Sequence, residues 1–389
     1  MFRNRSLIRL LSNRRSFSVC SHLKCTETVP KVDLSSLMDQ QYFILPKEAN
    51  DTLFRLNGWR EMHKNMFNLL DERAIMVRQP FKDLVQYFNR TDFSRPVNHG
   101  NFGNGKTFTM NHFIYFCYLN DMMILHCPAP YEWIYYPQET SISEYNNMRI
   151  DTPVESTIAL KAFKDMNAKL LEKLDLRTTQ KYTWSVREST EQGEPLKSVI
   201  DYGLNRMKKA SDCFAVVLKE IKKAADDGKF KLLVACDVVN ILYYEFSKVR
   251  YPNKHFVEVE NVTIARAMLK MLKNDWKNGL VVTAVDSKDA LRDKVNRLTG
   301  ESFGNDLPKE LLGVNVGYSV GFQALDPFIP IKVDQYSDSE IENCIDYYER
   351  KKFITHPSTK TEEGRNEIKF MSAYNPFECV NKQTVSLKI

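Results

Sequence analysis

The chain has 389 residues, of which 43% are hydrophobic, and its formal net charge is +6. This length allows two or three domains with a buried core. No apolar run reaches the roughly 18 residues of a membrane-spanning helix, so the sequence predicts no membrane span. The eight cysteines are scattered without a Cys-x-x-Cys pair, which indicates neither a zinc ribbon nor a disulfide framework and predicts free thiols.

Residues 1–17 have the composition of a mitochondrial presequence. They carry five arginines and no acidic residue, and a helix would gather their apolar side chains on one face. The segment RSFS at 15–18 is typical of a matrix processing site with cleavage after Phe17. The alternative is a basic tail that binds nucleic acid, but such a tail does not need an apolar face.

Most of the net positive charge lies in this predicted presequence. Without its five arginines, 50 basic side chains face 49 acidic ones, a net charge of +1. Nonspecific affinity for nucleic acid comes from many Lys and Arg contacts with phosphates. We therefore expect any contact with RNA to be local.

Residues 18–90 are predicted to form an N-terminal extension without a chemical motif. Helical patterns cover 49–70 and 72–88. From Thr91 onward strand and helix patterns alternate, and 92–99 is expected to be the first strand of a nucleotide-binding domain. Pro96 within it is unusual for a central strand.

The segment GNFGNGKT at 100–107 matches the phosphate-loop pattern Gly-x-x-x-x-Gly-Lys-[Ser/Thr]. Backbone N–H groups of such a loop point at phosphate oxygens, the lysine adds a positive charge, and the hydroxyl binds Mg²⁺. A helix predicted over 106–118 follows, as this mechanism requires. The alternative is a decayed loop that keeps only the turn. The predicted nucleotide-binding residues are Gly100, Asn101, Phe102, Gly103, Asn104, Gly105, Lys106, Thr107 and Phe108.

Strands and helices continue to alternate after the loop. Buried strands are predicted at 122–126, 232–236 and 279–285, and helices at 153–174, 196–227 and 262–275. This alternation predicts an α/β fold of the P-loop NTPase class, with a parallel sheet and helices on both faces.

Asp237 follows the apolar strand 232–236 and is the candidate for the second Mg²⁺ ligand beside Thr107. Its alternative role is to cap the next helix. In ATPases of this class a Glu after the Asp positions the attacking water, which Val238 cannot do. Glu245 or Asp286 could supply a base, but no motif points to either. The sequence predicts nucleotide binding with slow hydrolysis at most, and it leaves enzyme activity and the identity of the base open.

The chain ends in a predicted helical subdomain at 336–389, which follows the nucleotide-binding domain at 91–335. The segment 328–333 is expected to be the last strand, confined to an edge by Pro330. The segment Ser-Asp-Ser-Glu at 337–340 matches a capping box and predicts a helix to about residue 350. Another helix is predicted over 361–374.

From about residue 95 to 378, the chain resembles the death-associated protein family of the mitochondrial small ribosomal subunit. The motifs that carry the resemblance are GNGKT (103–107), RESTEQGEPL (187–196), KLLVACDVVNIL (231–242), KNDW (273–276), FQALDPFIPI (322–331), TEEG (361–364) and NP (375–376). Several of them, such as KNDW, are not general features of P-loop proteins.

The resemblance implies an AAA-like core and a place in the mitochondrial matrix, within the ribosome. It also implies bound GTP or GDP with Mg²⁺, contacts with small-subunit proteins, with the large subunit and locally with rRNA, and a link to apoptosis. The carried-over site is the loop at 100–107 with Asp237. Departures from the family pattern are Asn98, His99 and a longer segment at 291–320, which leave the strand order near the site open.

Three classes of function compete at this point. The first is a structural, nucleotide-binding component of the mitochondrial small subunit, the second an actively hydrolysing P-loop switch, and the third an adaptor that keeps only the fold. Two surface features are also expected. The polar block 187–196 is predicted to be exposed toward a partner. The aromatic cluster of Tyr131, Trp133, Tyr135 and Tyr136 is predicted to pack against the core or against a protein neighbour rather than to stack on RNA.

Overall fold

The computed structural model describes residues 25–26, 40–56, 58–89, 96–273, 275–286 and 324–380. The predicted presequence and the segment 291–320 lie outside these ranges. Within them, no helix combines the length and the apolar character needed to cross a bilayer.

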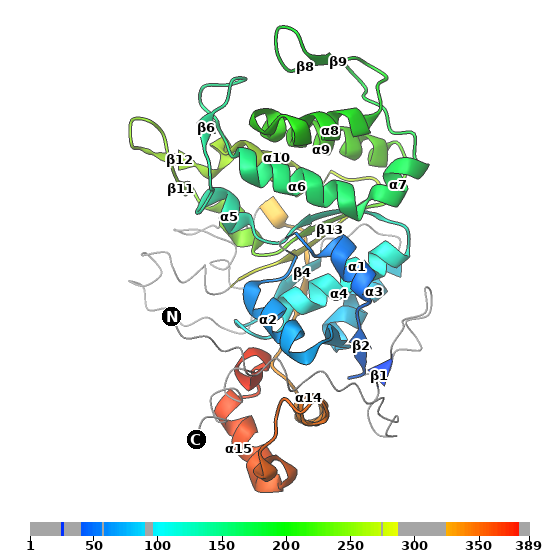
Figure 1. Cartoon of the computed structure of the whole chain (residues 1–389), viewed down its shortest axis with the longest axis vertical. Coiled ribbons are helices and arrows are strands. Elements are labelled where there is room, and N and C mark those ends of the chain that lie inside the picture. Colours follow the sequence, from blue (N-terminus) through cyan, green and yellow to red (C-terminus); the bar gives the residue numbers. More distant parts are fainter. Residues whose placement is uncertain are drawn as a thin grey trace, which may run out of the picture.

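A parallel sheet of five strands lies at the centre of the molecule (Figure 1). Its spatial order is β14 (Ile329–Lys332), β4 (Pro96–His99), β13 (Gly279–Ala284), β10 (Leu232–Cys236) and β5 (Met123–Cys127). Of these five strands β4 comes first in the chain, and it lies between β13 and β14, which come last. All residues of β4, β10 and β13 are buried, as expected for a sheet covered on both faces. The prediction of a parallel α/β sheet is confirmed.

Asn98 and His99, the departures before the phosphate loop, are residues of β4, which pairs with β13 and β14. Pro96 is the first residue of β4, where the missing N–H is tolerated. Pro330 lies in the edge strand β14, as the sequence predicts. The residues paired across β14 and β4 include Ile331 with Asn98 and Lys332 with His99.

Helices cover both faces of the sheet (Figure 1). One face carries α5 (Pro130–Ile134), α6 (Pro153–Met166), α8 (Leu196–Asn205), α9 (Ala210–Asp226) and α10 (Thr263–Met271), whose buried side chains form one apolar cluster with the strands. The other face carries α1 (Lys47–Leu53), α2 (Glu61–Leu70), α3 (Gln79–Asn89) and α4 (Lys106–Leu119), which form a second cluster.

Three long helical predictions are wrong in their continuity. The pattern at 153–174 is split into α6 and α7 (Ala168–Lys173), and Asn167 lies at the break. The pattern at 196–227 is interrupted at Arg206, between α8 and a 3₁₀ turn at Met207–Lys209. The pattern at 49–70 contains two helices, with Gly58 between them. In each case tertiary packing overrides a continuous apolar periodicity.

The N-terminal extension is not a helical appendage. Residues 74–76, predicted to be helical, form the strand β3 (Ala74–Met76) in a three-stranded sheet with β1 (Cys25–Thr26) and β2 (Tyr42–Ile44). Phe43, Trp59 and Phe81 share one apolar cluster with helix α4, which follows the phosphate loop. The extension and the nucleotide-binding domain therefore have a common core.

The other paired strands that the structure describes form three two-stranded ribbons, and two α-helices follow β14. The ribbons pair β6 (Ser141–Ile142) with β7 (Ile150–Asp151), β8 (Tyr182–Thr183) with β9 (Ser189–Thr190), and β11 (Phe246–Arg250) with β12 (Phe256–Glu258). Helix α14 (Asp338–Arg350) begins with the predicted capping box, and α15 (Glu362–Ser372) begins after Thr361. These helices lie at the bottom of Figure 1, on the side of the N-terminal extension.

Candidate nucleotide-binding site

The phosphate loop connects β4 to α4 at the carboxyl edge of the sheet. Gly103 and Gly105 have φ angles of +86° and +100°, a conformation that favours glycine. A Cβ on Gly103 would also lie 2.4 Å from Oδ1 of Asn375. Gly105 is the last residue before helix α4, which begins at Lys106 as predicted. Gly103 and Gly105 therefore occupy positions where a residue with a side chain would be strained.

Lys106 is folded back over its own loop. Its Nζ donates to the carbonyl oxygens of Gly100 at 2.8 Å and Asn101 at 2.9 Å. An ammonium has three donors, so one more is available to a phosphate oxygen. Burial lowers the pKa of Lys106, and the carboxylates of Asp286 and Asp237 oppose this shift.

Thr107 and Asp237, the two predicted Mg²⁺ ligands, lie in direct contact. The Thr107 hydroxyl donates to Oδ2 of Asp237 over 2.7 Å, and the Val238 N–H donates to Oδ1 over 2.9 Å. Asp237 is only 3% exposed, and burial raises its pKa against the opposing effects of Arg60 and Thr107. A hydroxyl and a carboxylate at the tip of a buried strand form an oxygen donor set that suits Mg²⁺.

Val238 lies outside the cavity that contains these residues. Its side chain is fully buried in the apolar cluster of the α6–α9 face, and its backbone is left-handed with φ 53°. The chain thus turns sharply after Asp237 and directs residue 238 into the core.

Two charged residues beside the loop have no recognisable motif. Arg60, at the start of α2, forms an ion pair with Asp286 at 3.2 Å, and both line the same cavity as Lys106 and Asp237. Of the two alternative bases considered from the sequence, Asp286 is therefore at the site. Glu245 is exposed and does not line this cavity. Arg60 could not be found from the sequence, because the extension carries no phosphate-binding pattern.

The cavity has a volume of about 180 Å³. Every predicted residue from Phe102 to Phe108 lines it, whereas Gly100 and Asn101 contribute only the carbonyl groups that hold Lys106. Its opposite wall is largely apolar and comes from the extension and the C-terminal subdomain. The residues of that wall include Met62, Met66, Phe81, Tyr336, Tyr348 and Phe377.

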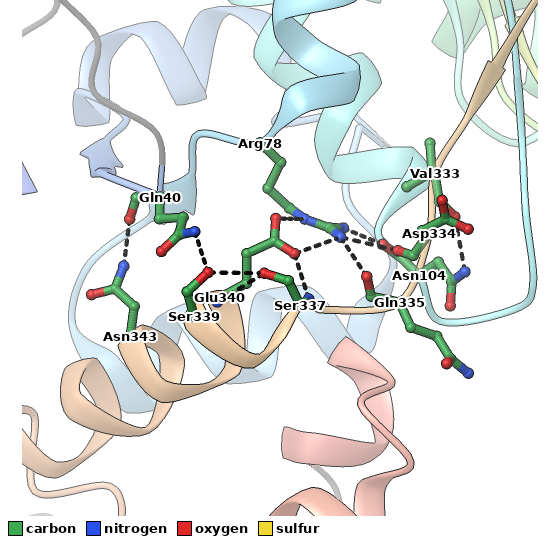
Figure 2. Close-up of polar contacts among 10 residues, drawn as sticks. All are labelled: Gln40, Arg78, Asn104, Val333, Asp334, Gln335, Ser337, Ser339, Glu340 and Asn343. Atoms are coloured by element: carbon green, nitrogen blue, oxygen red, sulfur yellow. Dashed lines mark hydrogen bonds and ion pairs between the residues drawn. The ribbon is translucent and has the colours of Figure 1, made fainter.

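The loop is held by residues distant in the sequence. Figure 2 shows Arg78 between Asn104 of the loop and Glu340 of helix α14. Asn104 also donates through Nδ2 to the Val333 carbonyl at 2.8 Å. Asn375, in the NP motif after α15, donates to the Phe102 carbonyl at 2.8 Å. The loop is therefore braced by three segments outside its own motif.

The two expected surface features lie away from this cavity. Trp133 is buried in the core, and Tyr131 and Tyr135 pack against it, whereas Tyr136 is 58% exposed. Lys248 lies 4.7 Å and 5.0 Å from the ring centres of Tyr135 and Tyr136. The block 187–196 includes β9, and its first residues are exposed beside the fully exposed Val186. Thr190 and Leu196 within the block are buried.

The donor set fits a polyphosphate with Mg²⁺. Within the described ranges, no group of three or more His, Cys, Asp and Glu side chains could hold a metal on its own. Mg²⁺ in nucleotide sites normally uses one or two protein ligands and completes its shell with phosphate oxygens and water.

Six cysteines in the described part of the chain are free thiols, and all six are buried: Cys117, Cys127, Cys213, Cys236, Cys344 and Cys379.

The sheet order, the glycine-rich turn before α4 and the aspartate at the tip of β10 define a protein of the P-loop NTPase fold class. The family model of mitochondrial ribosomal death-associated protein 3 matches residues 75–381. The chain belongs to this family, and its location is the mitochondrial ribosome in the matrix.

Two curated relatives agree with this assignment. The small ribosomal subunit protein mS29 of Bos taurus is 37% identical over 310 residues, which cover 79% of this chain and 74% of the relative. Its counterpart from Mus musculus is 34% identical over 343 residues, which cover 86% and 83%. Among solved structures, a Walker-type ATPase of Pyrococcus abyssi matches 80% of this chain and 67% of its own, with 11% identity and a TM-score of 0.40.

Proposed function

We propose that this chain is a structural component of the mitochondrial small ribosomal subunit that holds a guanine nucleotide with Mg²⁺. The ribosomal part rests on family membership and on the small-subunit names of the relatives. The nucleotide part rests on one observation above all, the contact of Thr107 with Asp237 in the cavity that also contains Lys106. Contacts with neighbouring ribosomal proteins, the large subunit and local rRNA belong to the same proposal.

Different residues of the cavity would contact the phosphates, the Mg²⁺ ion and the base of the nucleotide. Lys106 and Arg60 supply positive charge for the phosphates, and Thr107 and Asp237 would hold Mg²⁺. The cavity wall with Phe377 and Tyr336 offers an apolar surface for a purine base. Guanine is the base that the sequence resemblance implies. The link to apoptosis stays a prediction, because no contact described here bears on it.

A structural role is favoured over a hydrolytic switch. Residue 238 faces the core, and Asp286 is engaged by Arg60, so neither is placed as a free base for water. Bound nucleotide still has a physical effect, because a ligand at a thousand times its Kd stabilises the folded state by about 4 kcal/mol. Single-turnover GTP hydrolysis tests the switch, and a rate well above the rate in solution would favour it.

Nucleotide extraction tests the proposal itself. Small subunits containing the wild-type chain, Lys106→Ala or the exposed control Lys197→Ala are purified, and their nucleotides are identified by mass spectrometry. Loss of charge-assisted hydrogen bonds should weaken retention roughly tenfold to a hundredfold in Lys106→Ala only. Equal retention by all three, or no nucleotide in the wild type, would contradict the proposal.

A further inference from the structure

Three consecutive carbonyl groups of the phosphate loop accept hydrogen bonds from outside the nucleotide-binding domain. The Phe102 oxygen accepts from Asn375 Nδ2 at 2.8 Å, and the Gly103 oxygen accepts from the Phe377 N–H at 3.3 Å. The Asn104 oxygen accepts from Arg78 Nη1 at 2.8 Å. These donors come from the N-terminal extension and from the segment after helix α15.

The geometry of the peptide bond gives these contacts a consequence. In a trans peptide the C=O of one residue and the N–H of the next point in opposite directions. The Phe102 oxygen points at Asn375 and the Asn104 oxygen at Arg78, so the Gly103 and Gly105 N–H groups are directed away from these two side chains. Amides directed in this way are the donors that bind phosphate in a glycine-rich loop.

The same guanidinium also holds the beginning of the C-terminal subdomain (Figure 2). Arg78 Nε lies 2.8 Å from Oε1 of Glu340, and the two side chains are only 10% and 13% exposed. Arg78 Nη2 donates to the carbonyl oxygens of Asp334 at 3.0 Å and Gln335 at 3.1 Å, in the link between β14 and α14. Glu340 in turn completes the capping box of α14 with Ser337.

Arginine is the side chain that this junction requires. Its planar fork presents five N–H donors, which here reach a carboxylate and three carbonyl oxygens. A lysine ammonium is a compact charge and cannot span these positions at once. The loop and the C-terminal subdomain therefore share one rigid connection.

We propose that Arg78 and Asn375 are positioning residues for the phosphate loop, and that nucleotide binding is coupled to the seating of residues 336–380. This inference rests on the proposed nucleotide site. Because binding energies are reciprocal, a subdomain that orders the loop must itself be ordered by the nucleotide to the same degree. The ligand then sets how firmly helices α14 and α15 are presented to ribosomal neighbours.

The experiment compares the full chain with Arg78→Ala, Arg78→Lys and Asn375→Ala. The controls are Arg55→Ala, an arginine of the extension that pairs with Asp165, and Asn205→Ala, an exposed asparagine at the end of α8. Calorimetry with GDP and GTP measures affinity, and hydrogen exchange measures α14 and α15 with and without nucleotide. We expect affinity to fall on the order of tenfold in the three test variants and not in the controls. We also expect nucleotide to slow exchange over 338–372 in the wild type and much less in Arg78→Ala.

Two results would overturn the coupling: wild-type affinity in Arg78→Ala and Asn375→Ala, or exchange over 338–372 that nucleotide leaves unchanged. A wild-type chain that binds no nucleotide would instead refute the proposed function. In that case hydrogen exchange of the loop at 101–107 tests whether Arg78 positions the loop. Faster exchange in Arg78→Ala than in the wild type would support this role without a ligand, and unchanged exchange would exclude it. Circular dichroism shows whether each variant is folded. If Arg78→Ala does not fold, Arg78→Lys keeps the positive charge and tests the loss of the guanidinium hydrogen bonds.

Discussion

At the scale of single residues, Val238 shows why the missing catalytic glutamate cannot be restored by one substitution. Its side chain lies in the apolar core, and its backbone adopts a left-handed conformation that is rare for a β-branched residue. Val238→Glu should therefore bury an unpaired carboxylate and lower the free energy of unfolding by several kcal/mol, without faster phosphate release. Urea unfolding and single-turnover GTP hydrolysis check this, with Val238→Ala as the control for lost packing. A stable, rapidly hydrolysing variant would contradict the placement of this side chain.

We expect Asp151 to make the stability of the protein depend on pH. Burial raises its pKa from the ordinary 3.8 to about 6, although the Thr263 hydroxyl donates to it at 2.5 Å. Between these values the folded state holds a proton that the unfolded state has released. The contribution of Asp151 is therefore fully present below about pH 4 and is lost as pH rises to about 6, a change on the order of 3 kcal/mol. Urea unfolding at pH 4.5–7.5 should show this decline in the wild type relative to Asp151→Asn, and parallel profiles would contradict it.

At the scale of elements, Asn167 explains both the break between α6 and α7 and the protection of the edge strand β5. Its Oδ1 accepts from the Ile124 N–H at 2.7 Å, and its Nδ2 donates to the Ile124 and Phe163 oxygens at 2.8 Å. Asn167→Ala leaves both backbone groups of Ile124 without this partner, so the free energy of unfolding should fall by roughly 2–4 kcal/mol. Urea unfolding measures the loss, and the exposed Asn205→Ala serves as the control. A cost below that of the control would rule out this role for the side chain.

At the scale of the whole molecule, the C-terminal subdomain completes the fold rather than extending it. A third apolar cluster joins Tyr42, Leu70 and Met76 of the extension to Ile341 and Cys379. Removing residues 336–389 should uncover this surface, lower the melting midpoint and weaken nucleotide binding. Thermal unfolding and calorimetry on the truncated and the full chain test this. Equal midpoints and affinities would show that the subdomain is independent. The domain boundaries proposed from the sequence stay a prediction until then.

Short-range patterns in the sequence determined much of the fold and of the candidate site of this protein. The phosphate loop, the apolar strands at 232–236 and 279–284 and the capping box at 337–340 are each contained in fewer than ten residues, and the structure has them where they were predicted. Their geometry depends on backbone conformation and on side chains close by in the chain. Both can be predicted from the residue types and spacing in a short segment. The family also follows from such segments, because several of them are specific to it.

Only the tertiary structure decided which distant residues complete the site. Arg60, Arg78 and Asn375 reach the loop region from the extension and from the end of the chain, and the local sequence around each of them does not predict this contact. The breaks at Asn167 and Arg206 were missed for the same reason, because local apolar spacing there favours a continuous helix. Contacts between residues far apart in the chain depend on how the elements pack, and no short stretch of sequence contains that information.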